Sequence, residues 1–177
     1  MTDVPDTNAA AARLVAALAY RGMTCSAAES CTGGLVGAAI TSIPGSSAVF
    51  NGGVVSYANS VKRDVLGVPQ EVLDGKGAVS PECAEAMAAG VRRLLATDIA
   101  VSVTGIAGPG GGSAEKPVGL VWFGIASADG TKTFQMIFKG EREEVRRQAV
   151  RFALGLLVSA VPSDGFQSQN DSQIKRR

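Results

Sequence analysis

Hydrophobic positions near the N-terminus recur at the spacing of a helix. Leu14, Val15, Leu18 and Ala19 fall on one face of an amphipathic helix that the pattern predicts over residues 8–21. Beyond it, short apolar runs alternate with amphipathic stretches and are separated by Gly and Pro. This alternation predicts strands over 24–28, 53–57 and 99–103, and helices over 33–42, 60–66 and 81–96.

The last third of the chain has a different pattern. Residues 105–119 are rich in glycine and contain two prolines, which predicts a loop. Strands are expected over 120–126 and 131–138, and Asp129-Gly130 between them is a hairpin signal. A final helix follows, with Glu143 in its first turn and an apolar face that includes Val145. The order of elements favours a mixed sheet with helices on both faces.

The domain organisation is simple. A chain of 177 residues with 46% hydrophobic content is sufficient for one globular domain, which we place at 1–160. The polar composition of 161–177 predicts a disordered tail. The 17 Lys and Arg residues nearly balance 16 Asp and Glu residues, so the charge favours neither a nucleic-acid nor a membrane partner.

The location of the protein is expected to be cytoplasmic. No apolar run approaches the roughly 20 residues that span a bilayer, and the acidic N-terminal residues are unlike a secretory signal. The three cysteines have no C-x-x-C spacing, which is typical of reduced thiols and not of a disulfide framework or a zinc site.

The chain contains no histidine. This absence excludes Ser-His-Asp and Cys-His machinery and the usual zinc enzymes, because each needs an imidazole. Any catalytic base must therefore be Lys, Asp, Glu or Tyr.

One polar cluster lies between the end of a predicted strand and the start of the next predicted helix. Unpaired N–H groups at a helix start can bind a phosphate or an oxyanion, so Ser30 is a candidate nucleophile. The alternative is that Ser30 or Thr32 only caps the helix. Cys31 is a rival nucleophile, since a helix N-terminus lowers a thiol pKa, although a small buried thiol is the commoner fate. The cluster reads Glu29-Ser30-Cys31-Thr32-Gly33-Gly34, and we expect the residues around Ser30 in it to contact the substrate.

Two further clusters follow predicted strands. Tyr57, Asn59 and Lys62 lie at the second junction, where Lys62 could act as a base if burial lowers its pKa. The alternative is a solvated lysine on an amphipathic helix, which is the commoner state of a lysine. The third cluster is the glycine-rich loop after the strand at 99–103, at the edge where open α/β sheets bind ligands. A long surface loop without function is the alternative. Its candidate residues are Thr104, Gly105, Ile106 and Gly108.

Four motifs in this order resemble the CinA C-terminal domain family, which is the nicotinamide-nucleotide amidase family. The resemblance covers about residues 8–160. The motifs are Ala28-Glu29-Ser30-Cys31-Thr32-Gly33-Gly34, Gly53-Val54-Val55-Ser56-Tyr57 through Lys62, Ala78-Val79-Ser80, and Thr104-Gly105-Ile106-Ala107-Gly108-Pro109 with Lys116-Pro117-Val118-Gly119.

The resemblance implies a fold and an activity. The fold is a three-layer α/β/α sandwich with a mixed, mostly parallel sheet of about five strands that includes the C-terminal hairpin. The activity is hydrolysis of nicotinamide mononucleotide to nicotinate mononucleotide and ammonia by a stand-alone, homodimeric enzyme without metal or cofactor. Ser30 falls on the nucleophile, Lys62 on the catalytic lysine and Tyr57 on a less constant tyrosine. The glycine-rich loop falls on the pocket wall.

Two points stay open at this level. The substrate phosphate could be bound by the backbone of 105–112 or by an arginine such as Arg146. A nucleotide-binding or regulatory module without turnover could use the same pocket, but the presence of both Ser30 and Lys62 favours an enzyme. A pure interaction domain would leave the polar loops without a purpose.

Overall fold

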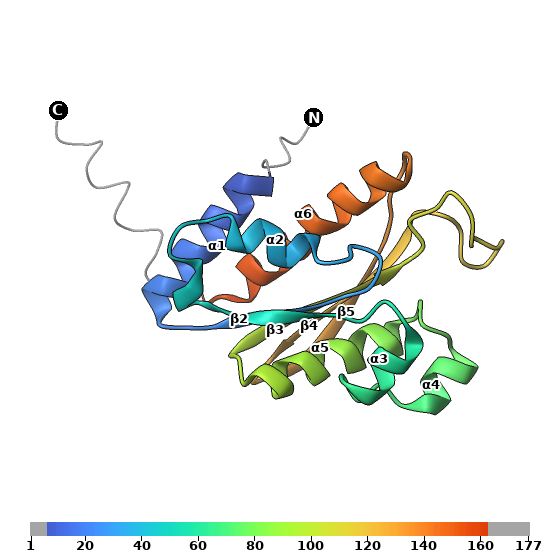
Figure 1. The fold of residues 1–177 in the computed structure, drawn as a ribbon, viewed down its shortest axis with the longest axis horizontal. Helices are drawn as coiled ribbons and strands as arrows, with labels where there is room; N and C mark the ends of the chain where they lie inside the picture. Colours follow the sequence, from blue (N-terminus) through green and yellow to red (C-terminus); the bar gives the residue numbers. More distant parts are fainter. Residues whose placement is uncertain (1–6, 163–177) are drawn as a thin grey trace.

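The computed structural model, which describes residues 7–162, has a central five-stranded sheet covered by helices on both faces (Figure 1). The strand order is β2-β1-β3-β4-β5, with β1 parallel to β2 and to β3, and β4 antiparallel to both neighbours. The elements in chain order are α1 (Thr7–Arg21), β1 (Cys25–Glu29), α2 (Leu35–Thr41), the 3-10 helix η1 (Ser46–Ala48), β2 (Phe50–Val55), α3 (Asn59–Asp64), α4 (Gln70–Gly75), α5 (Pro81–Leu95), β3 (Ile99–Gly105), β4 (Leu120–Ser127), β5 (Gly130–Ile137) and α6 (Arg142–Ala160).

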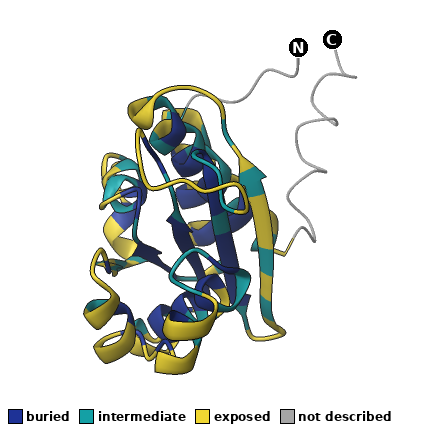
Figure 2. Ribbon diagram, turned by 90° about the vertical axis from the view of Figure 1, so that its right-hand side faces the viewer, coloured by how far each residue is buried: buried dark blue, intermediate teal, exposed yellow. Residues whose placement is uncertain are grey.

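This arrangement confirms the predicted fold, including the hairpin of β4 and β5. Helices α1, α2 and α6 cover one face of the sheet, and α3, α4 and α5 cover the other (Figure 1). Every residue of β1 is buried, and so is all of β3 except Gly105, because both strands are sandwiched between helix layers. The outer strand β5 is largely exposed (Figure 2).

The helix α5 and the segment after α3 are in close contact. A Cβ atom at Gly90 of α5 would collide with the backbone carbonyl of Leu66, so only glycine fits there. Leu66 and Val68 are buried in the apolar cluster that lies between α5 and the sheet. Because Lys62 lies one turn before Leu66, this contact holds the segment that carries Lys62 against α5.

The predicted helix starting at Ser80-Pro81 is confirmed as α5. The Ser80 hydroxyl accepts a hydrogen bond from Cys83 N at 3.2 Å, and Pro81 occupies the first helical turn. Most boundaries shift by one or two residues, and two of the differences bear on the site. The strand expected at 53–57 is β2, which begins earlier at Phe50 and ends at Val55. Gly52 and Gly53 have low strand propensity but still pair with β1, and Asn51 lies at a register shift between these pairs and that of Phe50.

The second difference concerns the helix expected at 33–42, which begins at Leu35. Gly33 and Gly34 have φ of 61° and 98°, a left-handed conformation that no right-handed helix accepts. The short elements η1 and α4 were not predicted, since each follows a Gly or Pro that had indicated a break.

The carboxyl ends of the parallel strands β1, β2 and β3 lie on the same side of the molecule as the N-terminus of α6 and the loop 106–119 (Figure 1). This side is therefore where ligand binding is expected. Within residues 7–162 no helix is both long enough and apolar enough to cross a bilayer. The tail was predicted over 161–177, and its residues from 163 onward lie outside the described part of the chain.

Candidate active site

Ser30 is the first residue after β1. Its backbone N–H donates to Val103 O on β3 at 2.9 Å, and its carbonyl accepts from Gly33 N at 3.1 Å. Ala96 is the one non-glycine residue with positive φ in residues 7–162, so Ser30 does not have the strained backbone of a nucleophile elbow. The left-handed conformations fall on Gly33 and Gly34 instead, and they turn the chain into α2.

The amine of Lys62 lies beside the Ser30 hydroxyl. Its Nζ is 3.1 Å from Ser30 Oγ, 2.7 Å from the carbonyl oxygen of Ser56 and 3.3 Å from that of Tyr57. Ser56 and Tyr57 follow β2, and Lys62 comes from α3. The structure therefore brings together the ends of two neighbouring parallel strands and the helix after the second one.

Burial controls the charge of Lys62. Its side chain is only 1% exposed, and desolvation lowers the pKa of the amine below its ordinary value of 10.5. Within residues 7–162 no carboxylate forms an ion pair with it. Burial therefore shifts the amine toward its neutral form, which is the form that can accept a proton.

Glu29 occupies the N-terminus of α2. Its carboxylate is 2% exposed and accepts hydrogen bonds from Gly34 N at 3.0 Å, Val36 N at 3.0 Å and Gly37 N at 2.9 Å. We had expected these helix-start N–H groups to hold an oxyanion. They are already paired, because the carboxylate is the acceptor that the positive end of a helix favours.

Cys31 is buried, and desolvation is the main reason that the pKa of its thiol is raised to about 11. The expected lowering by a helix start is outweighed, and a protonated thiol is a poor nucleophile. The next residue, Thr32, is fully buried, and its hydroxyl has no hydrogen-bond partner in residues 7–162. Thr32 therefore lies behind the turn and not on its open side.

A cavity of about 210 Å³ opens beside the Ser30 hydroxyl. Three of the four candidates in the glycine-rich loop line it, and Tyr57, which is 63% exposed, stands at its mouth. The lining residues are Ser30, Cys31, Tyr57, Gly105, Ile106, Ala107, Gly108, Gly110, Gly111 and Arg142.

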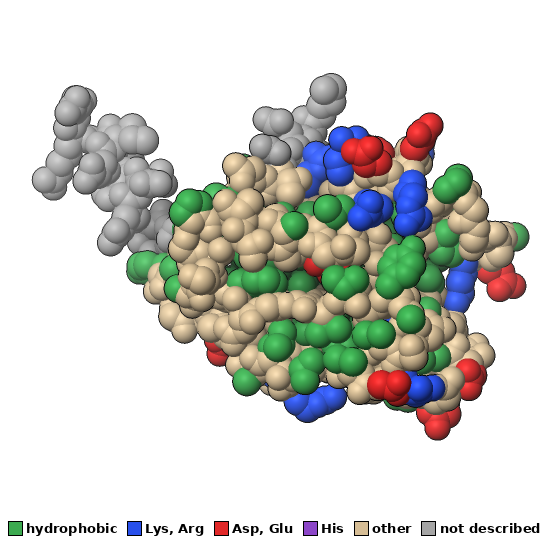
Figure 3. Space-filling view, in the orientation of Figure 1, with side chains coloured by type: hydrophobic (Ala, Val, Ile, Leu, Met, Phe, Trp, Pro, Cys, Tyr) green, Lys and Arg blue, Asp and Glu red, His purple; other side chains and the backbone are tan. Residues whose placement is uncertain are grey.

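The cation of this cavity is Arg142, which sequence reasoning missed. Its guanidinium donates to Gly108 O at 2.9 Å and to Tyr57 Oη at 3.3 Å, so it joins the loop, the strand end and α6. Arg146, the arginine that we had singled out, lies one turn further along α6 and donates to the carbonyls of Cys31 and Thr32. Figure 3 shows Lys and Arg side chains gathered over α6 on this face.

Two other expected binding residues lie away from the cavity wall. The hydroxyl of Thr104 donates to Ala78 O at 2.7 Å, so this side chain ties β3 to the segment before α5. Asn59 is exposed at the beginning of α3. The spacing from Arg146 was the one signal that could have identified Arg142, because residues four apart on a helix share a face.

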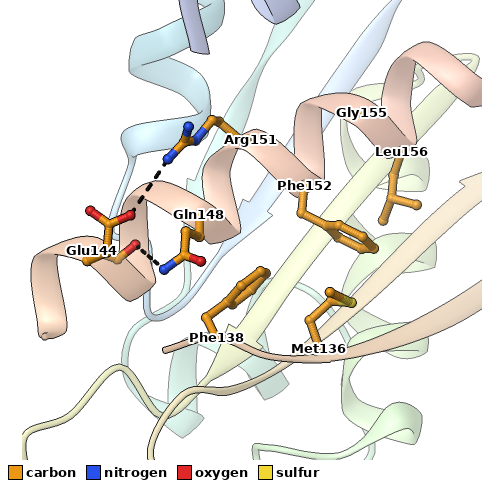
Figure 4. A pocket seen from close by; sticks show the side chains of 8 residues that line it. All are labelled: Met136, Phe138, Glu144, Gln148, Arg151, Phe152, Gly155 and Leu156. Atoms are coloured by element: carbon orange, nitrogen blue, oxygen red, sulfur yellow. Dashed lines mark hydrogen bonds and ion pairs between the residues drawn. The ribbon is translucent and has the colours of Figure 1, made fainter. Parts of the chain in front are cut away.

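A larger cavity of about 430 Å³ lies elsewhere, between β5 and α6 (Figure 4). Phe138, Phe152 and Met136 form its apolar wall. Its polar end is already paired, since Arg151 meets the Glu144 carboxylate at 3.7 Å and Gln148 donates to the Glu144 carbonyl. No serine, threonine or cysteine lines it. The cavity beside Ser30 has a hydroxyl with a buried amine next to it, so it is the candidate active site.

Comparisons with known proteins all point to the same family. The family model of the CinA C-terminal domain matches residues 7–161. A CinA-like protein of Geotalea uraniireducens is 58% identical over 125 residues, which are 71% of this chain and 30% of the relative. The nicotinamide-nucleotide amidohydrolase PncC of Enterobacter agglomerans is 54% identical over 140 residues, 78% of this chain and 85% of the relative.

The solved structures agree with the sequences. The crystal structure of the competence/damage inducible protein CihA from Agrobacterium tumefaciens superposes with a TM-score of 0.85 and 46% identity, and covers 88% of this chain and 95% of that one. This chain spans about a third of the length of several curated relatives. Its likeness to them is therefore a likeness to one part of each.

Proposed function

Because this chain belongs to the CinA C-terminal domain family, we propose that it is an amidohydrolase that converts nicotinamide mononucleotide to nicotinate mononucleotide and ammonia. The substrate is suggested by the name of the Enterobacter agglomerans relative, a nicotinamide-nucleotide amidohydrolase. The active site would be the cavity beside Ser30, with Ser30 as nucleophile and Lys62 as general base.

The arrangement of acceptors around Lys62 carries this proposal. A neutral amine has two N–H bonds and one lone pair. The carbonyl oxygens of Ser56 and Tyr57 accept the two N–H bonds, which leaves the lone pair for the hydroxyl of Ser30. Together with the lowered pKa of Lys62, this geometry supports proton transfer from Ser30 Oγ to Lys62 Nζ.

The first half of the reaction forms an ester. Lys62 takes the proton of Ser30 while the hydroxyl oxygen attacks the carboxamide carbon, which gives a tetrahedral intermediate with a negative oxygen. The ammonium of Lys62 then returns its proton to the amide nitrogen, and ammonia leaves as the C–N bond breaks. The positive pyridinium ring of the substrate draws electrons from the carboxamide and makes this attack easier.

The second half regenerates the enzyme. A water molecule enters where ammonia departed, Lys62 takes one of its protons, and the oxygen attacks the ester carbon. Collapse of the second tetrahedral intermediate breaks the bond to Ser30 Oγ, which regains its proton from Lys62. One amine thus serves as base and acid in both halves, so this mechanism needs no histidine, which the chain lacks.

The shape and charge of the cavity fit this substrate class. At about 210 Å³ it is smaller than the roughly 300–1,000 Å³ of typical ligand pockets, so it would hold the pyridine ring and carboxamide while the ribose phosphate stays at the mouth. The guanidinium of Arg142 and the backbone of Gly110 and Gly111 would meet the phosphate there.

An ammonia-release assay tests the proposal. We expect the protein to release ammonia from nicotinamide mononucleotide, and Ser30→Ala to lower kcat by at least about 10³-fold while keeping the circular dichroism spectrum. The matched control is Ser60→Ala on the exposed start of α3, which should keep full activity. Undiminished turnover in Ser30→Ala, or saturable binding of the nucleotide with no ammonia release by the unaltered protein, would contradict the proposal.

A further inference from the structure

The outer edge of β2 is open to solvent. Within residues 7–162 this strand pairs with β1 alone, so its far side has no neighbouring strand. We propose that a second copy of this chain pairs along this edge, β2 against β2, and lies beside the mouth of the Ser30 cavity. The pairing stands apart from the proposed function, and only its consequence for the cavity rests on that function.

The backbone of β2 offers hydrogen-bonding groups to another strand. Ser56 N donates to Glu29 O, so the N–H of Ser56 faces β1. Backbone groups of successive residues in a strand point to opposite sides, so the N–H and C=O of Gly53 and Val55 face away from β1. The pairing with β1 is regular from Gly52 to Val55. This segment can therefore pair with another strand without rearrangement.

The sequence of β2 lacks the usual protection of an open edge. Proteins commonly block such an edge with a charged side chain, often lysine, or with proline. β2 contains neither, whereas the opposite edge strand β5 carries the exposed Lys132. The register shift at Asn51 comes before the regular segment and leaves that segment available.

The surface around this edge is uncharged. Although 19% of the chain is Lys, Arg, Asp or Glu, none of these residues falls in 30–61. That stretch forms the turn after β1, then α2, η1, β2 and the beginning of α3. Figure 3 shows a band of hydrophobic side chains across the middle of the face where β2 lies, with charged side chains mostly at its borders.

Apolar side chains flank the strand on both faces of the sheet. Val55 is 51% exposed and lies against Gly34 at the start of α2. On the opposite face, the half-buried Leu95 of α5 lies against Gly52. A strand placed beside β2 would remove these apolar groups from water while it pairs the backbone.

A second copy is the occupant that fits this surface. A two-fold axis brings the same surface of each chain against itself, so charges near the axis would meet their own copies. An antiparallel pair of identical strands satisfies such an axis, because the two strands exchange equivalent hydrogen bonds. The groove between β5 and α6 fits less well, since two copies meeting there would have to desolvate Glu144 and Arg151.

The contact would extend the wall of the active site. Tyr57 alone lines the cavity from the β2 side, and the other lining residues come from the turn after β1, from the end of β3 with the loop that follows, and from α6. Tyr57 lies two residues beyond Val55, about 7 Å along an extended chain. A chain paired with β2 would therefore pass beside the mouth and help to enclose the ribose phosphate.

The test measures mass and amide exchange of the full chain. Sedimentation velocity from about 1 μM to about 200 μM gives the mass and the Kd of self-association. NMR hydrogen exchange follows Gly53 N–H, with Ser56 N–H, which is bonded to Glu29 O, as the internal reference. The variant is Val55→Lys, and its matched control is Ile137→Lys, which puts the same charge on β5 at a residue that is 57% exposed.

We expect the unaltered protein to sediment at about twice the 18.0 kDa of one chain, with slow exchange at Gly53 N–H. Val55→Lys should raise the Kd at least about 100-fold, because the contact would bury an unpaired charge. Gly53 N–H should then exchange quickly while Ser56 N–H stays slow. Ile137→Lys should behave as the unaltered protein.

The ammonia-release assay tests the consequence for the cavity. Monomeric Val55→Lys should show a KM for nicotinamide mononucleotide raised at least about 5-fold and a kcat within about 2-fold, because Ser30 and Lys62 meet within one chain. An unchanged KM in that monomer would overturn the link between the contact and the cavity.

The pairing itself would be overturned by a monomer at every concentration, by a dimer that Val55→Lys leaves intact, or by dissociation in Ile137→Lys alone. Quick exchange at Gly53 N–H in the unaltered protein would also overturn it, and this measurement decides the matter if Val55→Lys does not fold. If the unaltered protein releases no ammonia, the proposed function fails, while mass and exchange still decide the pairing.

Discussion

Lys62 Nζ and Ser30 Oγ lie 3.1 Å apart, although 32 positions separate the two residues in the sequence. Parallel pairing of β1 with β2 explains this proximity, because Ser30 follows the end of one strand and the chain reaches Lys62 shortly after the end of the other. The buried amine has no carboxylate partner in residues 7–162, so proton transfer to it creates a charge that only dipoles stabilise.

The pH dependence of the reaction should report Lys62. The neutral amine is the active form, so kcat/KM is expected to rise with pH and to level off above the lowered pKa of Lys62. In Lys62→Met the residual rate should be about 10²–10⁴-fold lower and should lack this limb. The control is Lys76→Met, an exposed lysine whose loss should leave the profile unchanged. A limb that persists in Lys62→Met would remove Lys62 as the base.

The same substitution should not destabilise the protein at neutral pH. The pKa of Lys62 is lower in the folded state than its ordinary 10.5, so the unfolded chain binds more protons between the two values. Stability conferred by this site therefore rises with pH in that window, by at most about 1.4 kcal/mol per pH unit, and the cost of burial is fully present below it.

Thermal denaturation of both proteins across pH 6 to about 10.5 checks this sign. We expect Lys62→Met to melt at the same or a higher temperature near pH 7, with its advantage shrinking as the pH rises. A variant that melts lower at pH 7 and recovers at high pH would show the opposite linkage, in which the folded state holds Lys62 protonated.

Replacement of the carboxylate that caps α2 should cost stability. Glu29→Gln keeps the shape, but one of the two acceptor oxygens becomes an NH₂ group that faces backbone donors. We expect a loss of about 1–3 kcal/mol in the free energy of unfolding, measured by urea denaturation. Glu85→Gln on the exposed face of α5 is the control and should change it by less than about 0.5 kcal/mol. Equal effects of the two substitutions would argue against the capping role.

Arg142 should discriminate substrates by their phosphate. We expect Arg142→Met to raise KM for nicotinamide mononucleotide by about 10–100-fold, since a lost charged hydrogen bond is worth about 1.5–3 kcal/mol. Turnover of nicotinamide riboside, which lacks the phosphate, should change little. Arg147→Met serves as the control. An equal loss for both substrates would place the role of Arg142 in shaping the cavity, through Gly108 and Tyr57, and not in binding phosphate.

Most of the architecture could be predicted from the sequence. The period of the apolar residues and the positions of Gly and Pro located five strands and the long helices. Burial on one or both faces of an element sets the spacing of its apolar residues. The start of β2 was missed because Asn51-Gly52 has the composition of a turn, and only the pairing of Phe50 and Gly52 with β1 makes this segment a strand. The local conformational preferences of these residues could not indicate their pairing with β1.

The candidate site was predicted less completely, because a sequence does not show how deeply a given side chain is buried. Sequence spacing placed Lys62 on a short helix but could not show that this lysine faces inward. It also could not distinguish Arg142 from Arg146, which share one face of α6. The two differ in what they contact, since Arg142 donates to Gly108 O in the glycine-rich loop and Arg146 donates to Cys31 O in the turn after Ser30. Glu29 was expected to contact a ligand, and its actual partner is the backbone of its own helix start.

The burial of Lys62 has a practical consequence for chemical modification. Amine-reactive reagents need solvent access to a neutral amine, and Lys62 is 1% exposed. Lys76, Lys132 and Lys139 are exposed, and all three lie outside the lining of the cavity beside Ser30. Dyes, cross-linkers and solid supports should therefore attach at the surface lysines and spare Lys62, so the protein can be labelled or immobilised through its amines with the contact between Lys62 and Ser30 intact.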